Sequence, residues 1–197
     1  MTDVSGLRAS DWTTIIPVAG KGTRLGHDAP KVLYPVLGVP MAIWLFRLFA
    51  PVCSRIVWVV SESGRDAIAT CVRAGDAGFD QQFAIQAVPL GMADAVACGV
   101  AHVATPNCLV VWGDQIVLRR ETIDAARRGV EIEGAAMAWP TVRRSNPYIH
   151  VVRDASGAVE QVLQAREGEI MPREQGEGES DTGLFAFRAA ALRNVLE

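Results

Sequence analysis

One stretch near the start of the chain limits the possible folds more than any other. Residues 13–18 are an apolar run rich in β-branched residues, which predicts a buried strand. A Gly-x-Gly sequence at residues 20–22 follows, and its glycines let the backbone turn sharply and approach a ligand. Successive N–H groups in such a loop bind anions, and Lys21, Arg24 and Lys31 add three cations. The pattern indicates a strand that leads into a loop for a polyphosphate.

This loop has neither of the two common phosphate-loop sequences. The Walker pattern needs Gly-x-x-x-x-Gly-Lys followed by Ser or Thr, and the dinucleotide pattern needs Gly-x-Gly-x-x-Gly. Here Gly22 is followed by Thr23, Arg24 and Leu25, so both patterns are excluded. A glycine-rich surface turn with incidental cations is the alternative interpretation, and the preceding strand pattern argues against it.

Predicted strands and helices alternate along the first two thirds of the chain. Apolar runs predict further strands at residues 55–60, 82–88, 107–112 and 134–139. Helices are predicted between the strands, at residues 41–52, from about residue 64, at 91–100 and at 121–128. Such alternation predicts an α/β fold with a parallel, doubly wound sheet and right-handed crossovers.

Beyond Pro140 the pattern changes. Two short strands are predicted at residues 148–153 and 158–164, joined by a hairpin turn of sequence Asp-Ala-Ser-Gly. Residues 165–181 are polar and predict a solvated loop, after which a strand and a final helix are predicted at residues 183–187 and 189–196. We expect an N-terminal tail at residues 1–12 and a single domain at residues 13–197.

Composition excludes several classes of protein. Of the 197 residues, half are hydrophobic and 21% are charged, which favours a globular domain over disorder. The net charge of −3 argues against a broad basic face for nucleic acid. The four cysteines lack Cys-x-x-Cys spacing, so we expect core residues without a zinc or redox role. Neither a signal peptide nor a membrane span is indicated, so we expect a cytoplasmic protein.

Two predicted features should meet at one edge of the sheet. In an open α/β sheet, ligands bind outside the carboxyl ends of the strands. The glycine loop follows the first strand and Asp114 follows the fourth, so both should reach the same crevice. An aspartate at this position is suited to hold Mg²⁺, which takes one or two carboxylates while phosphates supply other ligands. A helix cap or turn residue is the alternative interpretation for Asp114.

The sequence resembles the sugar-phosphate nucleotidyltransferase family. The segment Ala-Gly-x-Gly-Thr-Arg-Leu from Ala19, followed by Pro-Lys-Val-Leu-Tyr-Pro-Val from Pro30, is similar to the signature of this family. It is most similar to the uridylyltransferase domains of bifunctional enzymes that make UDP-N-acetylglucosamine. The resemblance extends from Thr13 to about Leu196, and it implies a mixed, mostly parallel, Rossmann-like sheet.

The resemblance also implies a role for each residue that matches a family motif. Arg24, Lys31 and Asp114 would be catalytic, with Asp114 as the ligand of Mg²⁺. The nucleotide, with UTP or CTP favoured, would bind to Val18, Ala19, Gly20, Lys21, Gly22, Thr23, Gln86, Leu90, Gly91 and Met92. Among these, Gln86 would recognise the base. The phosphorylated acceptor would bind to Trp112, Gly113, Tyr148, Gln164 and Asp181.

Several positions depart from the family pattern. Gly91 is followed by Met-Ala where the family has Thr-Gly, so the base is left open. At the acceptor site the usual glycine is Ile149, the usual glutamate is Gln164 and the usual asparagine is Asp181. Isoleucine narrows a pocket, and the two exchanges between acid and amide reverse which groups accept hydrogen bonds. The resemblance is therefore not taken to imply that N-acetylglucosamine 1-phosphate is the substrate of this chain.

The implied activity is transfer of a nucleoside monophosphate from a nucleoside triphosphate to a sugar 1-phosphate or a related phosphorylated alcohol, with release of pyrophosphate. The first alternative is a cytidylyltransferase for an alcohol phosphate such as phosphocholine, since Trp139, Tyr148 and the acids near Asp181 could surround a cationic head group. The second is a catalytically silent relative that senses nucleotide sugars. Pyrophosphate release distinguishes the enzymes from the sensor.

The family also implies a segment that this sequence lacks. In the family a second metal ligand comes from downstream of the strand at residues 183–187, together with elements that close the domain. The sequence stops at Glu197, within the predicted final helix. We therefore expect a shortened chain or one that is partly covered by another chain, for which a homo-oligomer is one arrangement.

Overall fold

The computed structural model describes residues 6–20, 29–76, 78–164 and 177–196. The chain divides into two compact units. The main unit comprises residues 1–138 and 184–197, and the small unit comprises residues 139–183. Residues 21–24 of the predicted phosphate loop lie outside the described residues, so their roles stay predictions.

A six-stranded sheet of order β5-β4-β1-β6-β12-β7 forms the centre of the main unit. Its strands are β1 (Trp12–Pro17), β4 (Arg55–Val60), β5 (Asp80–Ile85), β6 (Asn107–Val111), β7 (Met137–Ala138) and β12 (Leu184–Arg188). The first four strands of this order pair in parallel, and β12 is antiparallel to both β6 and β7. The predicted mixed, mostly parallel sheet is confirmed. The strand predicted at residues 82–88 is shifted, since β5 runs from residue 80 to 85. The strand predicted at residues 134–139 was too long, since only Met137–Ala138 pair as β7.

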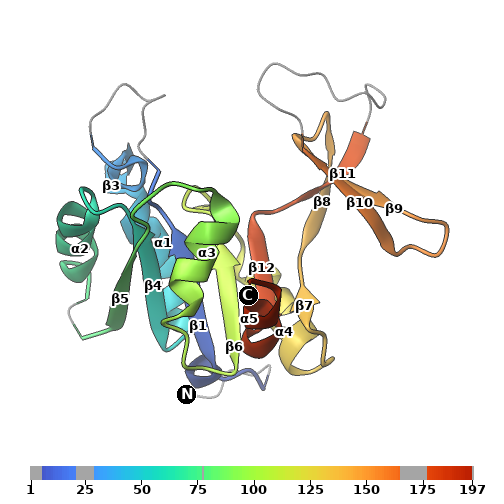
Figure 1. Cartoon of the computed structure of the whole chain (residues 1–197), viewed down its shortest axis with the longest axis horizontal. Coiled ribbons are helices and arrows are strands. Elements are labelled where there is room, and N and C mark those ends of the chain that lie inside the picture. Colours follow the sequence, from blue (N-terminus) through green and yellow to red (C-terminus); the bar gives the residue numbers. More distant parts are fainter. Residues whose placement is uncertain (1–5, 21–28, 77, 165–176, 197) are drawn as a thin grey trace. The chain divides into compact units, whose positions relative to one another are not determined.

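Helices cover both faces of this sheet (Figure 1). They are α1 (Met41–Phe49), α2 (Arg65–Arg73), α3 (Met92–Val100), α4 (Arg120–Glu131) and α5 (Ala189–Leu196). Alternate residues of β1 face the two layers: Ile16 packs with residues of α1, α2 and α4, and Ile15 packs with residues of α3 and α5. The sheet is therefore doubly wound. None of the helices in the described ranges has the length and apolar character that crossing a membrane requires.

Short elements complete the main unit. The predicted helix at residues 41–52 ends at Phe49 and continues as a 3-10 turn, η4 (Ala50–Val52), at Pro51. Further 3-10 turns are η1 (Ala9–Asp11) and η3 (Lys31–Leu33), and β2 (Pro35–Val36) pairs with β3 (Val39–Pro40). The sequence patterns did not indicate these elements because each is only two or three residues long.

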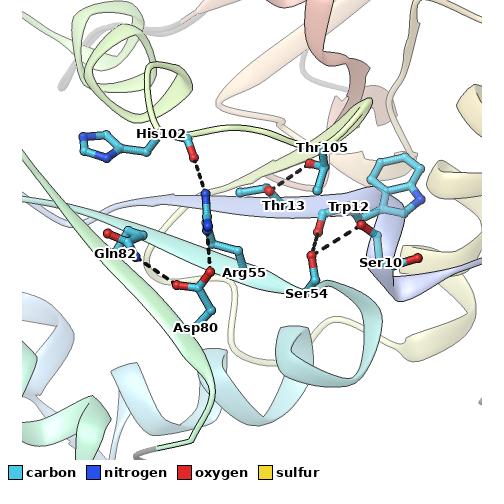
Figure 2. Close-up of polar contacts among 9 residues, drawn as sticks. All are labelled: Ser10, Trp12, Thr13, Ser54, Arg55, Asp80, Gln82, His102 and Thr105. Carbon is cyan, nitrogen blue, oxygen red and sulfur yellow. Dashed lines mark hydrogen bonds and ion pairs between the residues drawn. The ribbon is translucent and has the colours of Figure 1, made fainter.

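Polar side chains join the strands at the amino-terminal edge of the sheet (Figure 2). Arg55 and Asp80 are opposite each other on β4 and β5, and Nε of Arg55 lies 2.7 Å from Oδ2 of Asp80. Arg55 also donates to the carbonyl oxygen of His102 at 3.1 Å. On the other side of β1, the hydroxyl of Thr105 donates to that of Thr13 at 2.8 Å. These contacts occupy the edge opposite to the predicted loop and hold the strand starts in register.

The small unit contains a four-stranded antiparallel sheet of order β10-β9-β11-β8. The strands are β8 (Thr141–Ser145), β9 (Ile149–Arg153), β10 (Val159–Gln164) and β11 (Glu177–Asp181). The predicted hairpin of β9 and β10 is confirmed, and the Asp154 carboxylate accepts hydrogen bonds from the backbone N–H groups of Ser156 and Ala158. β8 was not predicted.

The prediction of a loop throughout residues 165–181 was wrong at its end, where β11 forms. The sequence of β11, Glu-Gly-Glu-Ser-Asp, has no apolar residue, so it carries no local strand signal. It becomes a strand because β8 and β9 pair with its two edges. Arg153 of β9 also binds the Glu179 carboxylate through two nitrogens, at 2.6 and 2.8 Å. Hydrogen bonds and the charge of Arg153 lower the pKa of Glu179 to about 2.

Replacing Gly99 should destabilise the main unit. A Cβ atom there would lie 2.5 Å from Cγ2 of Ile15 and 3.0 Å from Cγ2 of Val59, both on strands in the sheet centre. Alanine in a helix gains up to about 1 kcal/mol in propensity, whereas overpacking a core costs about 1–3 kcal/mol. We expect Gly99→Ala to lower the free energy of unfolding by about 1–2 kcal/mol, measured by urea denaturation. Unchanged or increased stability would contradict this close packing.

The Glu179 ion pair should stabilise the small unit in a pH-dependent way. A carboxyl group whose pKa is lowered on folding contributes stability above its ordinary pKa of 4.5, and this contribution is lost as the pH falls toward about 2. We expect Glu179→Gln to be less stable than the original chain at pH 7, with a difference that shrinks as the pH falls through this range. The difference in stability is measured by hydrogen exchange of the backbone amides of β9 and β11. Glu160→Gln, at an exposed position of β10, is the matched control and should show no such trend.

Candidate active site

Four parallel strands of the main unit end at one edge of the sheet. β1 ends at Pro17, and the predicted nucleotide-binding residues Val18, Ala19 and Gly20 follow it. Gln86 follows β5, and Trp112, Gly113 and Asp114 follow β6. Because β1 lies between β4 and β6, the turns after β1 and β6 are neighbours.

The turns after β1 and β6 pass very close to each other. A Cβ atom on Gly113 would lie 2.7 Å from Cγ1 of Val18 and 3.0 Å from the carbonyl oxygen of Pro17. Only glycine fits at this position without displacing its neighbours. The backbone N–H of Val18 donates to the carbonyl oxygen of Val59 on β4, at 2.7 Å. Gly113 thus brings Asp114 close to the start of the glycine loop.

Lys31 and Asp114 meet at this edge. Nζ of Lys31 lies 2.8 Å from Oδ2 of Asp114, although the residues are 83 positions apart. The two side chains are 48% and 46% exposed. An ion pair so accessible to water contributes at most about 1 kcal/mol to stability. Both groups can therefore exchange partners at a small cost in free energy. Groups that bind a charged ligand need this property.

Gln86 has a different environment from that ion pair. It is only 6% exposed, and its amide nitrogen donates to the carbonyl oxygen of Gly91 at 3.0 Å and to Oδ2 of Asp94 at 2.7 Å. Gly91 has φ +120°, a conformation open to glycine but strained for other residues. The predicted neighbours Leu90 and Met92 are exposed on either side of it.

Asp94 is a functional candidate that the sequence interpretation missed. It lies in the first turn of α3, where an acid is favoured by the helix dipole in any protein. Its position three residues after Gly91 is the only local signal. What distinguishes it is the contact with Gln86, which the fold creates.

The predicted acceptor-binding residues are divided between the two units. Trp112 and Gly113 belong to the main unit, where the Trp112 ring packs against that of Phe185 on β12 with 5.2 Å between centroids. Tyr148, Gln164 and Asp181 belong to the small unit. There the amide nitrogen of Gln164 donates to the hydroxyl of Tyr148 at 3.1 Å.

The three departures from the family pattern among the predicted acceptor-binding positions form one row across the small sheet. Gln164 is opposite Ile149, and Asp181 is opposite Thr141. Glu179 is paired with Val151, so antiparallel register brings Asp181 beside Ile149. Residues in such a row project from the same face of a sheet. The isoleucine thus stands between the amide and the carboxylate.

Asp181 is the acid in this row. Its side chain is partly buried, and this burial raises the pKa of its carboxyl group, while a hydrogen bond from the backbone N–H of Gly183 opposes the shift. A carboxylate in such a position is stabilised by a hydrogen-bond donor or a cation that covers it.

Asp114 is the residue predicted to hold Mg²⁺, and its half-exposed carboxylate lies at this edge. Within the described parts of the chain, no group of three or more His, Cys, Asp or Glu side chains could hold a metal ion. Magnesium commonly takes only one or two carboxylates and completes its shell with water and substrate phosphates. A half-exposed carboxylate that follows Gly113, close to Val18 at the start of the predicted phosphate loop, suits that mode of binding.

Known proteins are similar to this chain over most of its length. The family model described as "MobA-like NTP transferase domain" matches residues 14–178. The chain is 34% identical over 188 residues to the bifunctional protein GlmU of Geobacter metallireducens, covering 92% of this chain and 38% of that protein. It is 30% identical over 187 residues to GlmU of Oleidesulfovibrio alaskensis, covering 92% and 40%. The chain thus spans about two fifths of the length of these relatives.

Two solved structures have a similar fold. CMP:2-keto-3-deoxy-manno-octonic acid synthetase complexed with CTP has a TM-score of 0.70 at 14% identity, covering 94% of this chain and 77% of that one. HddC from Yersinia pseudotuberculosis has a TM-score of 0.66 at 17% identity, covering 92% and 79%. At such low identity the likeness shows the fold alone. The family match includes most of β1, the Lys31–Asp114 pair and Gln86, so the chain belongs to the family of MobA-like NTP transferase domains and is a nucleotidyltransferase.

Proposed function

We propose that this chain transfers a nucleoside monophosphate from a nucleoside triphosphate to the phosphate of a sugar 1-phosphate or a related phosphorylated alcohol, releasing pyrophosphate. The observation that carries this proposal is the meeting of Lys31 and Asp114 at the carboxyl edge, beside the start of the glycine loop. The resemblance of the sequence to sugar-phosphate nucleotidyltransferases supports a phosphorylated sugar as acceptor. The similar solved structure that is complexed with CTP supports a nucleotide as donor.

The proposed reaction is a single in-line displacement. An oxygen of the acceptor phosphate attacks the α-phosphorus, and the bond to the bridging oxygen breaks so that pyrophosphate leaves with the electron pair. Such a reaction requires positioning and neutralisation of charge on phosphoryl oxygens, and it needs no covalent nucleophile. Lys31 and Arg24 are the two cations predicted to neutralise the triphosphate. Mg²⁺ on Asp114 would add further neutralisation when bound.

The row of departures in the small unit bears on the choice of acceptor. Ile149 fills space that a glycine would leave open, and Asp181 offers an anionic hydrogen-bond acceptor. An alcohol phosphate with a cationic head group, such as phosphocholine, is the second candidate, because an ammonium group would stabilise the partly buried Asp181 carboxylate. A cytoplasmic location and self-association stay predictions.

One screen tests the proposed function. Pyrophosphate release is measured with each common nucleoside triphosphate, Mg²⁺ and a panel of sugar 1-phosphates and alcohol phosphates. We expect release that depends on both a triphosphate and an acceptor. Nucleotide binding without release for any pair would instead indicate a sensing protein.

Asp114→Asn should lower turnover by roughly 100-fold or more, because the change preserves shape and removes the charge that would hold Mg²⁺. Steady-state pyrophosphate release at several Mg²⁺ concentrations measures the effect. Asp11→Asn, in the η1 turn at the chain's amino-terminal side, is the matched control and should keep normal turnover. Normal activity of Asp114→Asn, or a loss explained by unfolding, would remove Asp114 from this role.

Lys31→Ala and Asp181→Asn should have contrasting effects on acceptor choice. Loss of the Lys31 contact with the triphosphate should slow the reaction with every acceptor by a similar factor, roughly 10- to 100-fold. Asp181→Asn should change the ranking of acceptors and disfavour cationic ones most. Ratios of kcat/KM across the panel distinguish the two patterns. Finding the reverse would mean that the two ends of the site are assigned backwards.

A further inference from the structure

The hydrogen bonds of Gln86 determine which way its amide group points. Its nitrogen carries two hydrogens, and it has two partners, the carbonyl oxygen of Gly91 and Oδ2 of Asp94, at 3.0 and 2.7 Å. A carbonyl oxygen and a carboxylate can only accept hydrogen bonds. The nitrogen must therefore face these partners, since the reversed amide would place three acceptor oxygens together.

The surroundings hold this orientation firmly. Gln86 is only 6% exposed, so turning its amide would leave buried polar atoms without partners. Its backbone N–H is bound to the carbonyl oxygen of Val60 at 2.9 Å, which fixes the start of the side chain. Gly91, at φ +120°, directs its carbonyl oxygen to both Gln86 and the N–H of Ala95. Of the two anchors, only Asp94 is a side chain and can be changed by substitution without altering the turn.

Both amide hydrogens of Gln86 are thereby used within the protein. Within the described ranges, Oε1 of Gln86 receives no hydrogen bond. Gln86 can thus offer a ligand an acceptor and cannot offer it a donor. A base whose ring nitrogen carries a hydrogen, as in uracil or guanine, matches this acceptor. Cytosine presents a lone pair at the corresponding ring nitrogen, and two facing acceptors repel each other.

We propose that Asp94 is a positioning residue that fixes the polarity of Gln86, so that the site selects nucleotides whose base has a ring N–H group, UTP over CTP. This inference rests on the proposed function, because it assigns Gln86 to the base. It goes beyond that function by naming the residue that sets the choice and the chemical group that is chosen.

Nucleotide binding in the absence of an acceptor tests the inference. Dissociation constants for UTP, CTP and 3-methyl-UTP are measured by calorimetry with Mg²⁺ for the full chain and for Asp94→Asn. We expect the original chain to bind UTP at least roughly tenfold more tightly than the other two, because 3-methyl-UTP lacks the ring hydrogen and CTP has a lone pair there. In Asp94→Asn the amide can donate as well as accept, so Gln86 can reverse, and the UTP to CTP preference should fall by roughly tenfold.

Asp66→Asn is the matched control, since Asp66 is an exposed acid in the first turn of α2 and its loss changes the helix dipole interaction in the same way. It should leave the base preference unchanged. A purely structural role for Asp94 would weaken binding of all three nucleotides by one common factor. That result, or a preference for CTP in the original chain, would overturn the inference.

Pyrophosphate release is measured separately and distinguishes failure of the inference from failure of the proposed function. Selective UTP binding without release contradicts the proposed function alone. Release with an unchanged base preference in Asp94→Asn contradicts the inference alone.

Discussion

The position of β1 is the constraint on which the rest of the main unit depends. All six residues of β1 are buried, because parallel neighbours pair with both of its edges and helices cover both of its faces. A strand in this position has no charged residue, and its two polar residues, Thr13 and Thr14, are fully buried. The chain leaves the strand at the carboxyl edge. Parallel pairing with β6 then brings the end of β6 to the same place. The contact of Gly113 with Val18 and the Lys31–Asp114 pair both follow from this arrangement.

The carboxyl edge combines two kinds of polar group that differ in their freedom to move. Lys31 and Asp114 are about half exposed, so separating them costs little and both can turn to a phosphate or a metal ion. Gln86 is buried and bound at its amide nitrogen by two acceptors, so its rearrangement is costly. Accessible charges suit the part of a ligand that must react and leave. A buried, oriented amide suits the part that must be recognised.

The small unit is stabilised in a different way. Its strand β11 is acidic and lacks apolar residues, and it is held by backbone pairing on both edges and by the two-point contact between Arg153 and Glu179. Such a sheet can change its exposed side chains with little effect on its core. Gln164, Ile149 and Asp181, the three residues that depart from the family pattern, lie in one row of this sheet.

The sequence by itself determined the alternation of strands and helices, the mostly parallel sheet and the edge at which Lys31 and Asp114 would lie. It could do so because long apolar runs and glycine loops are local signals. Only the tertiary structure decided that residues 177–181 form a strand, that Asp94 orients Gln86, and that Ile149 stands between Gln164 and Asp181. These features depend on partners that are distant in the sequence or on the orientation of a side chain. The local periodicity of a sequence predicts neither the distant partners nor the orientation.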